Sequence, residues 1–274
     1  MGVVTKLFDL TGKVAWVTGG AGGIGRAIAD ALTAHGARVM IASRNFENVE
    51  QAAKEMNQQY EGDQHNVKVA AVGLDVCHDS SVQRAVRKVI DVFGRLDILV
   101  NAAGTTIRKP TIDLTSEEFA HMYDLHVAGS LRCSQEACHL FREQHSGCIV
   151  NLASVSSYAD LIEVAAYASA KSAILGLTRS LANEWAKYGI RTNAIAPGFV
   201  PTDLNRSLIE NTDRGRRIIE RTPAGRFATG DEIAGAAVFL ASPGASFVNG
   251  HTLVVDGGFL TCGVGDTDAQ WEND

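Results

Sequence analysis

The fold is decided by the stretch Val14-Ala15-Trp16-Val17-Thr18-Gly19-Gly20-Ala21-Gly22-Gly23-Ile24-Gly25. Its first five residues are apolar or β-branched and predict a short buried strand at 14–18. Five glycines follow in the next seven positions, and a helical pattern begins at Ile24. A strand that passes through a glycine-rich turn into a helix is typical of the first half of a βαβ unit.

The same alternation continues along the chain. Short apolar runs predict buried parallel strands at residues 14–18, 38–42, 68–74, 98–101, 148–152, 191–196 and 252–255. Longer amphipathic patterns predict helices at residues 24–34, 49–59, 80–93, 116–142, 165–188 and 231–240. This order predicts an α/β protein with a doubly wound parallel sheet of about seven strands. No linker, low-complexity run or repeat divides the 274 residues, so we expect one domain, residues 1–274.

The composition argues against several classes of protein. The formal net charge is −6 with both signs interspersed, which argues against nucleic-acid binding. The five cysteines form no CxxC pair and no metal-ligand spacing with the eight histidines, so we expect reduced thiols and no bound metal. Residues 1–6 contain neither an apolar signal core nor a myristoylation pattern. We therefore expect a cytoplasmic protein with no membrane partner.

The glycine-rich turn predicts a dinucleotide site. Its backbone N–H groups can approach a pyrophosphate, and the following helix N-terminus favours negative charge. Ser43-Arg44 stands at the end of the second strand, where an NAD-binding protein usually offers an acid to the ribose. Serine removes a carboxylate that would repel a 2′-phosphate, and the guanidinium can bind that phosphate. NADP(H) is therefore favoured; NAD(H) remains an alternative, because Arg44 could equally be a solvated surface charge.

Tyr167 and Lys171 predict proton-transfer chemistry. They are four residues apart in a predicted helix, so they share one face, and Ser154 lies thirteen positions before the tyrosine. A cation about 4 Å from the phenol is worth about 4 kcal/mol at an effective dielectric near 20, which would lower the phenol pKa by about one to three units. The pair alone is equally compatible with an amphipathic helix surface.

Together these motifs resemble those of the short-chain dehydrogenase/reductase family, from about residue 10 to residue 259. The matching residues are Gly19, Gly23, Ile24, Gly25, Asp75, Val76, Asn101, Ala102, Ala103, Gly104, Ser154, Tyr167, Lys171, Pro197, Gly198, Thr202, Asp256, Gly257 and Gly258. The resemblance implies a Rossmann-type fold and an oxidoreductase that interconverts a secondary alcohol and a ketone. It also implies a homotetramer built on the helices at 116–142 and 165–188.

The resemblance also implies how the cofactor is held. Asp75 and Val76 would flank the adenine, and the turn from Asn101 to Gly104 would stabilise the sheet beside the cofactor. Thr202, after Pro197-Gly198, would contact the nicotinamide carboxamide.

For catalysis, the resemblance implies that Ser154 holds the substrate oxygen and that Tyr167 exchanges its proton. Lys171 would bind the nicotinamide ribose and lower the tyrosine pKa. One position departs from the family pattern, because His126 falls where most members carry an asparagine that helps hold a water leading to the lysine. An imidazole can also bind a water, and a pKa near 6.5 would make the relay sensitive to pH. The alternative is a histidine that packs in its helix with both ring nitrogens satisfied.

Two residues bear on the substrate in opposite ways. Arg108, in the run Arg108-Lys109-Pro110, suits an anionic substrate, and a similar run occurs in gluconate 5-dehydrogenase-like members that act on sugar acids. Glu163, four residues before Tyr167, would favour a polyol or an amine. We therefore predict NADP(H)-dependent oxidation and reduction of a small polar substrate, with a sugar acid such as 5-ketogluconate as the leading candidate. The alternatives are an NAD(H)-dependent reductase of another ketone or polyol, and a nucleotide-binding sensor without turnover.

Two segments near the C-terminus complete the prediction. Residues 203–227 are polar and contain six arginines, which predicts a substrate lid or an ordinary charged surface. These arginines are Arg206, Arg214, Arg216, Arg217, Arg221 and Arg226. Residues 260–274 form a C-terminal tail with a lone tryptophan, Trp271, which suggests either docking on a neighbouring subunit or disorder.

Overall fold

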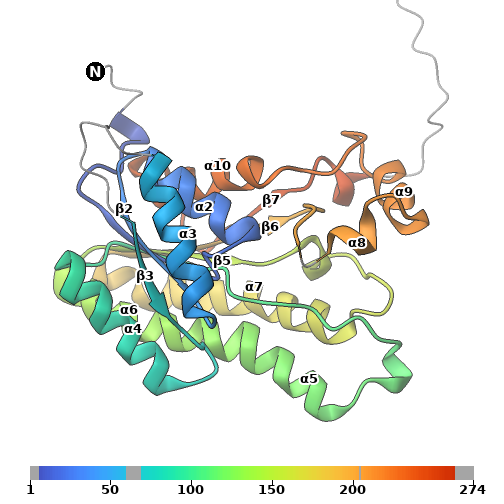
Figure 1. The fold of residues 1–274 in the computed structure, drawn as a ribbon, viewed down its shortest axis with the longest axis horizontal. Helices are drawn as coiled ribbons and strands as arrows, with labels where there is room; N and C mark the ends of the chain where they lie inside the picture. The colour runs from blue at the N-terminus through green and yellow to red at the C-terminus, as the bar shows by residue number, and fades with distance from the viewer. Residues whose placement is uncertain (1–5, 60–68, 204, 263–274) are drawn as a thin grey trace, which may run out of the picture.

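The computed structural model of the chain describes residues 6–59, 69–203 and 205–262. These residues form a seven-stranded parallel sheet with the order β3-β2-β1-β4-β5-β6-β7 (Figure 1). The strands are β1 Val14–Thr18, β2 Arg38–Ser43, β3 Val69–Gly73, β4 Ile98–Asn101, β5 Gly147–Leu152, β6 Ile190–Pro197 and β7 Thr252–Val255. The chain starts at β1, builds outward to β3, then returns to β4 and builds the other way. The predicted doubly wound fold is confirmed, and its direction reverses between β1 and β4.

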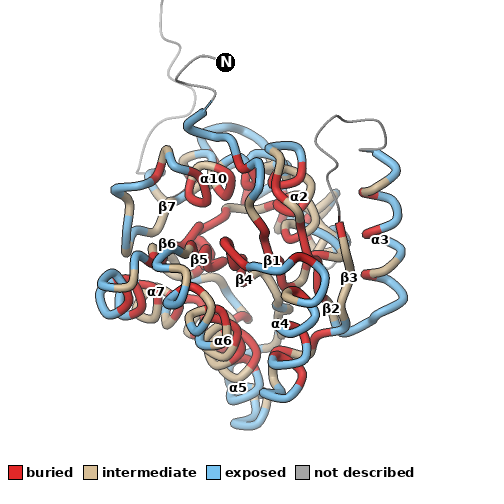
Figure 2. Tube along the Cα trace, turned by 90° about the vertical axis from the view of Figure 1, so that its left-hand side faces the viewer, coloured by how far each residue is buried: buried red, intermediate tan, exposed pale blue. Residues whose placement is uncertain are grey.

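Helices cover both faces of the sheet (Figure 2). One face carries α2 Gly23–Ala34, α3 Phe46–Gln59 and α10 Gly230–Ala241, and the other carries α4 Asp79–Phe93, α5 Ser116–Tyr123, α6 Gly129–Gln144 and α7 Ala165–Trp185. Successive residues of β1 pack alternately: Ala15 and Val17 contact the first layer, Val14 and Trp16 the second. Because both faces are covered, the strands read as continuous apolar runs rather than alternating ones.

The predicted helix at 116–142 is not one α-helix. The α-helix α5 ends at Tyr123, a π-helical segment η2 spans Asp124–Ala128, and α6 then continues to Gln144. The wider turn has no signature in the hydrophobic spacing, because the apolar positions remain on one face throughout. A π-helical turn inside a helix is frequent at functional sites, and this one contains His126.

Short helical elements account for the other differences between the predicted and the observed helices. The predicted helix at 165–188 ends as an α-helix at Trp185 and continues as the 3₁₀ turn η4 Ala186–Tyr188. Within the predicted lid, the structure shows two helices that the sequence did not indicate, α8 Arg206–Ile209 and α9 Asp213–Glu220. Their polar composition and brevity hide any periodicity. The remaining 3₁₀ turns are η1 Thr111–Asp113, η3 Val155–Ser157, η5 Pro243–Ala245 and η6 Phe259–Thr261.

Several composition-based expectations can be compared with the described residues. Cys77, Cys133, Cys138 and Cys148 form no disulfide. Within the described ranges, no group of three or more His, Cys, Asp or Glu side chains could hold a metal ion, and no helix is both long and apolar enough to cross a bilayer. Trp271 and residues 263–274 of the predicted tail lie outside the described residues.

Candidate active site

A cleft of about 980 Å³ opens at the carboxyl-terminal ends of the strands. It lies beside the reversal between β1 and β4, where ligands bind in doubly wound sheets. Most of the predicted site residues line it, although they come from distant parts of the sequence. They are Gly19, Gly23, Ile24, Gly25, Ser43, Arg44, Gly104, Arg108, His126, Ser154, Tyr167, Lys171, Pro197, Gly198 and Thr202.

Four predicted site residues do not line the cleft. The buried Asn101 side chain donates from Nδ2 to Asn151 Oδ1 at 2.9 Å and to Ser134 Oγ at 3.1 Å, so it ties β4 to β5 and α6. Its side chain does not line the cleft, and the part of Asn101 in supporting the cofactor site stays a prediction. Asp75 accepts from the Cys77 backbone N–H at 3.0 Å in a turn, and Val76 packs in the core.

The fourth is Glu163, whose side chain binds a residue of the cleft lining. Its Oε2 accepts from Arg108 Nε at 2.6 Å, and its backbone has a positive φ of 70°. Its carbonyl also accepts from the Lys109 N–H at 2.7 Å. The two residues expected to favour opposite substrates therefore bind each other, and each neutralises the other's charge.

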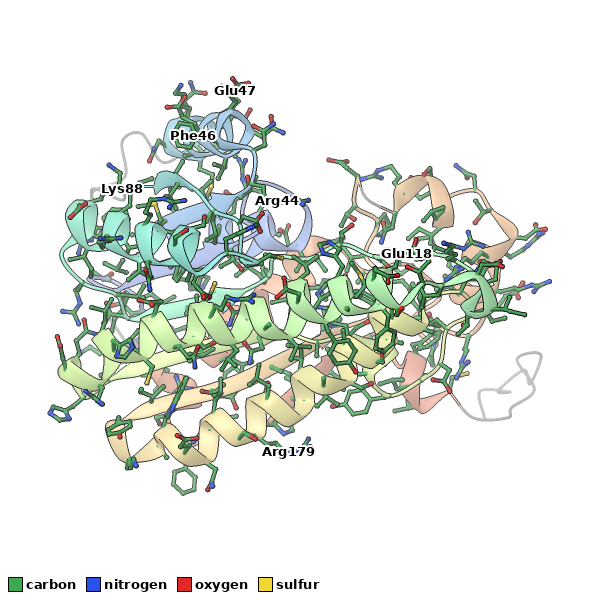
Figure 3. The ribbon with its side chains drawn as sticks, turned by 90° about the horizontal axis from the view of Figure 1, so that it is seen from below. Arg44, Phe46, Glu47, Lys88, Glu118 and Arg179 are labelled. Atoms are coloured by element: carbon green, nitrogen blue, oxygen red, sulfur yellow. The ribbon has the colours of Figure 1, made fainter. Side chains whose placement is uncertain are left out.

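The nucleotide end of the cleft fits a dinucleotide that carries a 2′-phosphate. Helix α2 begins after Gly22 with no side-chain cap and no acid in its first turn, so its first N–H groups are available to a phosphate. Ser43 and Arg44 line the cleft at the end of β2. Among the described residues no carboxylate forms an ion pair with Arg44. Figure 3 shows Arg44 on the loop between β2 and α3, with Phe46 and Glu47 further out on α3.

Ser154, Tyr167 and Lys171 meet at the other end of the nucleotide site. Ser154 follows β5 and caps η3, where its Oγ accepts from the Ser156 N–H at 3.1 Å. Tyr167 and Lys171 lie in the first two turns of α7, on the face that packs toward β5 and β6. Lys171 Nζ donates to the Leu152 carbonyl at 2.6 Å and lies 5.6 Å from the centre of the Tyr167 ring. Ser154 and Tyr167 are therefore placed to bind one substrate oxygen, with Lys171 Nζ beside the phenol ring.

The expected lowering of the tyrosine pKa is wrong for the chain by itself. Burial raises the pKa of Tyr167, and a hydrogen bond with Ser154 offsets only part of that increase. Burial also lowers the pKa of Lys171 to about 7. Burial removes water from both side chains and so disfavours the charged form of each. As the pH rises, Lys171 therefore loses its proton well before the Tyr167 phenol ionises. Tyr167 therefore remains protonated at neutral pH.

This burial predicts an unusual pH dependence of stability. The folded-state pKa of Lys171, about 7, lies below the ordinary value of 10.5. Between these values the unfolded chain binds a proton that the folded chain does not, so stability rises with pH, by at most about 1.4 kcal/mol per pH unit. Lys171→Met removes this titration. From about pH 7 to about pH 9 we expect wild type to gain about 2 kcal/mol relative to the variant in urea unfolding; parallel pH profiles would contradict this.

His126 is held as a neutral ring. Its Nε2 lies 2.8 Å from the Thr105 carbonyl, which can only accept, so Nε2 carries the proton and Nδ1 does not. Nδ1 is buried and has no hydrogen-bond partner among the described residues. The ring meets Tyr167 edge-on with centroids 5.4 Å apart. Burial, with the charge of Lys171 second, lowers the His126 pKa to about 3, so the ring carries no charge near neutral pH. A part for His126 in the proton relay stays a prediction.

Sequence reasoning missed the opposite wall of the cleft. Leu161, Val164 and Phe199 supply apolar surface, and α8 and α9 add Leu208, Ile209 and Arg214. Arg214 was one of six arginines in its segment, and nothing in its spacing singled it out.

The geometry defines a class of protein. A doubly wound parallel sheet, an uncapped helix N-terminus after a glycine turn, and a Ser-Tyr-Lys group in the same cleft describe a dinucleotide-dependent dehydrogenase or reductase. A family model described as Enoyl-(Acyl carrier protein) reductase matches residues 19–260. The chain belongs to the short-chain dehydrogenase/reductase family and is an oxidoreductase that acts on CH–OH groups.

Similar proteins include enzymes of sugar acids and of a polyol. The chain is 36% identical to a 2-dehydro-3-deoxy-D-gluconate 5-dehydrogenase of Dickeya dadantii, over 94% of this chain and 99% of the relative. It is 39% identical to a D-threitol dehydrogenase of Mycolicibacterium smegmatis, over 92% and 94%. A similar solved structure is a gluconate 5-dehydrogenase from Burkholderia cenocepacia in complex with NADP and tartrate, at 33% identity, 94% and 99% coverage and a TM-score of 0.88.

Proposed function

We propose that this protein is an NADP(H)-dependent oxidoreductase that interconverts a secondary alcohol and a ketone on a sugar acid such as 5-ketogluconate. The main support for this proposal is that one cleft contains both a proton-transfer group and basic side chains. The group is Ser154, Tyr167 and Lys171, and the basic side chains are Arg108 and Arg214. Glu163 is paired to Arg108, whereas Arg214 lines the same cleft without an ion pair to a carboxylate of the described residues. The names of the relatives that act on gluconate derivatives agree with an acidic substrate.

The side chains have distinct tasks in this proposal. NADPH, when bound, supplies the hydride. Ser154 and Tyr167 hydrogen-bond the substrate carbonyl oxygen, which fixes its orientation. Tyr167, protonated because burial raises its pKa, gives its proton to that oxygen during reduction and takes it back during oxidation. Lys171 anchors to the Leu152 carbonyl through one N–H, which leaves two donors for the nicotinamide ribose.

The cofactor preference depends on Arg44. We expect Arg44→Ala to raise the KM for NADPH by about 10- to 100-fold and to leave the KM for NADH within about twofold, because a charge-assisted hydrogen bond is worth about 1.5–3 kcal/mol. Steady-state kinetics with both cofactors measures this. Lys88→Ala, on the exposed side of α4 (Figure 3), is a control and should change neither value. An Arg44→Ala enzyme with an unchanged KM for NADPH would overturn the cofactor proposal.

An uncharged polyol substrate is the second candidate, because the threitol dehydrogenase is as similar to this chain as the sugar-acid enzymes. Assays with sugar acids and polyols, each with NADP⁺ and NAD⁺, decide between them. The homotetramer, the lid and the cytoplasmic location stay predictions of the sequence and the family resemblance, as do the adenine contacts of Asp75 and Val76.

A further inference from the structure

We propose that Arg214, on α9, binds the substrate carboxylate and thereby selects acids over neutral polyols. The inference rests on the proposed function, because it names the residue that recognises the acidic end of the substrate. Three observations carry it: the place of Arg214 in the cleft, the partners that hold most of the neighbouring basic side chains, and the close packing that holds α9.

Arg214 differs from the other arginines of its segment. It lines the cleft together with Asn205, Leu208 and Ile209 of the same segment, and its side chain is half-buried. The other arginines lie outside the cleft lining. Arg206 pairs with Glu210, Arg216 with Asp213 and Arg226 with Glu232, and Arg221 stacks on Phe259 with 4.7 Å to the ring centre. The fold therefore directs one guanidinium of the six toward the substrate.

The basic residues of the facing loop already have partners. Arg108 Nε binds Glu163 at 2.6 Å, and Lys109 Nζ binds Glu118 of α5, labelled in Figure 3, with both oxygens at 3.0 Å. In the described part of the chain, no carboxylate comes within ion-pair distance of Arg214. The charges of Arg108 and Glu163 act on the Arg214 pKa in opposite directions, the first lowering it and the second raising it. Arg214 is therefore a cleft-lining guanidinium that no carboxylate of the described residues holds in an ion pair.

This charge is partly removed from water. Burial is the main cause of the lowered pKa of Arg214, and the positive charge of Arg108 adds to it. A guanidinium is too basic to lose its proton here, so the cost of its desolvation persists until an anion binds. A substrate carboxylate would offset this desolvation cost by accepting two parallel hydrogen bonds from the guanidinium. A hydroxymethyl group offers no charge, and an ammonium would be repelled.

Helix α9 packs closely against α8, which fixes the position from which Arg214 reaches the cleft. Gly215 follows Arg214 directly, and a Cβ at Gly215 would overlap the Ile209 carbonyl of α8. Thr212 caps α9 by accepting from the Gly215 N–H at 3.0 Å. Thr202, which lines the cleft, donates from its N–H to Asn205 Oδ1 at 2.7 Å, so α8 is tied to the end of β6. Arg214 is therefore placed by backbone packing.

The test compares two ketones that differ only at the acidic end. L-Sorbose has the carbon skeleton and hydroxyls of 5-keto-D-gluconate, with a hydroxymethyl group in place of the carboxylate. We expect Arg214→Gln to lower kcat/KM for 5-keto-D-gluconate by about 100-fold and to change kcat/KM for L-sorbose by less than about twofold, with NADPH saturating. Arg214→Lys should recover about a tenth of the lost activity, because an ammonium keeps the positive charge but cannot donate two parallel hydrogen bonds to a carboxylate.

Two variants serve as controls. Arg217→Gln, on the same helix and outside the cleft, should leave both substrates unchanged. Glu163→Gln releases Arg108 from its partner, so kcat/KM for the acid should stay level or rise. Activity on L-sorbose shows that each variant is folded.

The outcomes separate the two proposals. If wild type does not prefer the acid to L-sorbose, the proposed substrate class is wrong and this inference is wrong with it. If wild type prefers the acid and Arg214→Gln keeps that preference, the inference alone is overturned. An equal loss on both substrates would also overturn it, because it would show that Arg214 only maintains the fold.

Discussion

Replacing Tyr167 with phenylalanine is expected to lower kcat for ketone reduction by about 10³-fold, within the range of 10²–10⁴ typical of general acid catalysis. The phenol is the group in this cleft that is both protonated at neutral pH and hydrogen-bonded to Ser154. Phenylalanine keeps the ring that meets His126 edge-on at 5.4 Å, so packing should be preserved. NADPH binding and the melting temperature should therefore remain close to wild type.

Steady-state reduction together with fluorescence titration of NADPH tests this expectation. Tyr158→Phe is a matched control, since Tyr158 is 51% exposed and should tolerate the change. A Tyr167→Phe enzyme that keeps a tenth or more of its activity would refute the assigned role. Wild-type protein that binds NADPH and turns over no ketone would instead favour the nucleotide-binding sensor.

Gly104→Ala is expected to be strongly disruptive for a single added methyl group beside the cleft. A Cβ at Gly104 would overlap Cε1 of His126 and lie 2.9 Å from its Nδ1. The ring is buried between Thr105 and Tyr167, so it cannot move without breaking those contacts. We expect a loss of about 1–3 kcal/mol in the free energy of unfolding, the usual cost of overpacking, and a fall in kcat of at least about tenfold.

A double variant isolates the cause. In a His126→Ala background the added methyl group meets no ring, so Gly104→Ala should cost less than in wild type by about 1–2 kcal/mol, as in a coupling between residues in contact. Gly235→Ala is the matched control, because nothing lies within 4 Å of a Cβ there, and it should not destabilise α10. Additive effects of the two substitutions at positions 104 and 126 would contradict the proposed contact.

Local signals in the chain were sufficient to predict the sheet. Each predicted strand matches an observed one to within one residue at either end within the described residues, because a strand buried on both faces must be an uninterrupted apolar run. The glycine turn, the Tyr167-Lys171 spacing and the Ser154 strand end were equally visible, since each depends on a few neighbouring residues. Family resemblance then related these separate motifs to one site.

The same reasoning failed where an answer depended on what lies across the fold. Arg108 and Glu163 were assigned opposite preferences, although they bind each other at 2.6 Å across 55 positions of sequence. The pKa direction of Tyr167 was misjudged, because desolvation depends on how deeply the fold buries a group and the sequence does not show that depth.

The amino-acid sequence by itself determined the layered α/β architecture, the nucleotide turn and the spacing that places Tyr167 and Lys171 on one helix face. These follow from spacing along the chain, which sets the face of a helix or strand on which a residue lies. Tertiary structure alone decided which arginine of the segment 203–227 lines the cleft, that the ring of His126 remains neutral, and that the Asn101 side chain bonds Asn151 and Ser134. Those outcomes depend on burial and on partners from distant segments, and both exist only after the sheet has brought the ends of its strands together.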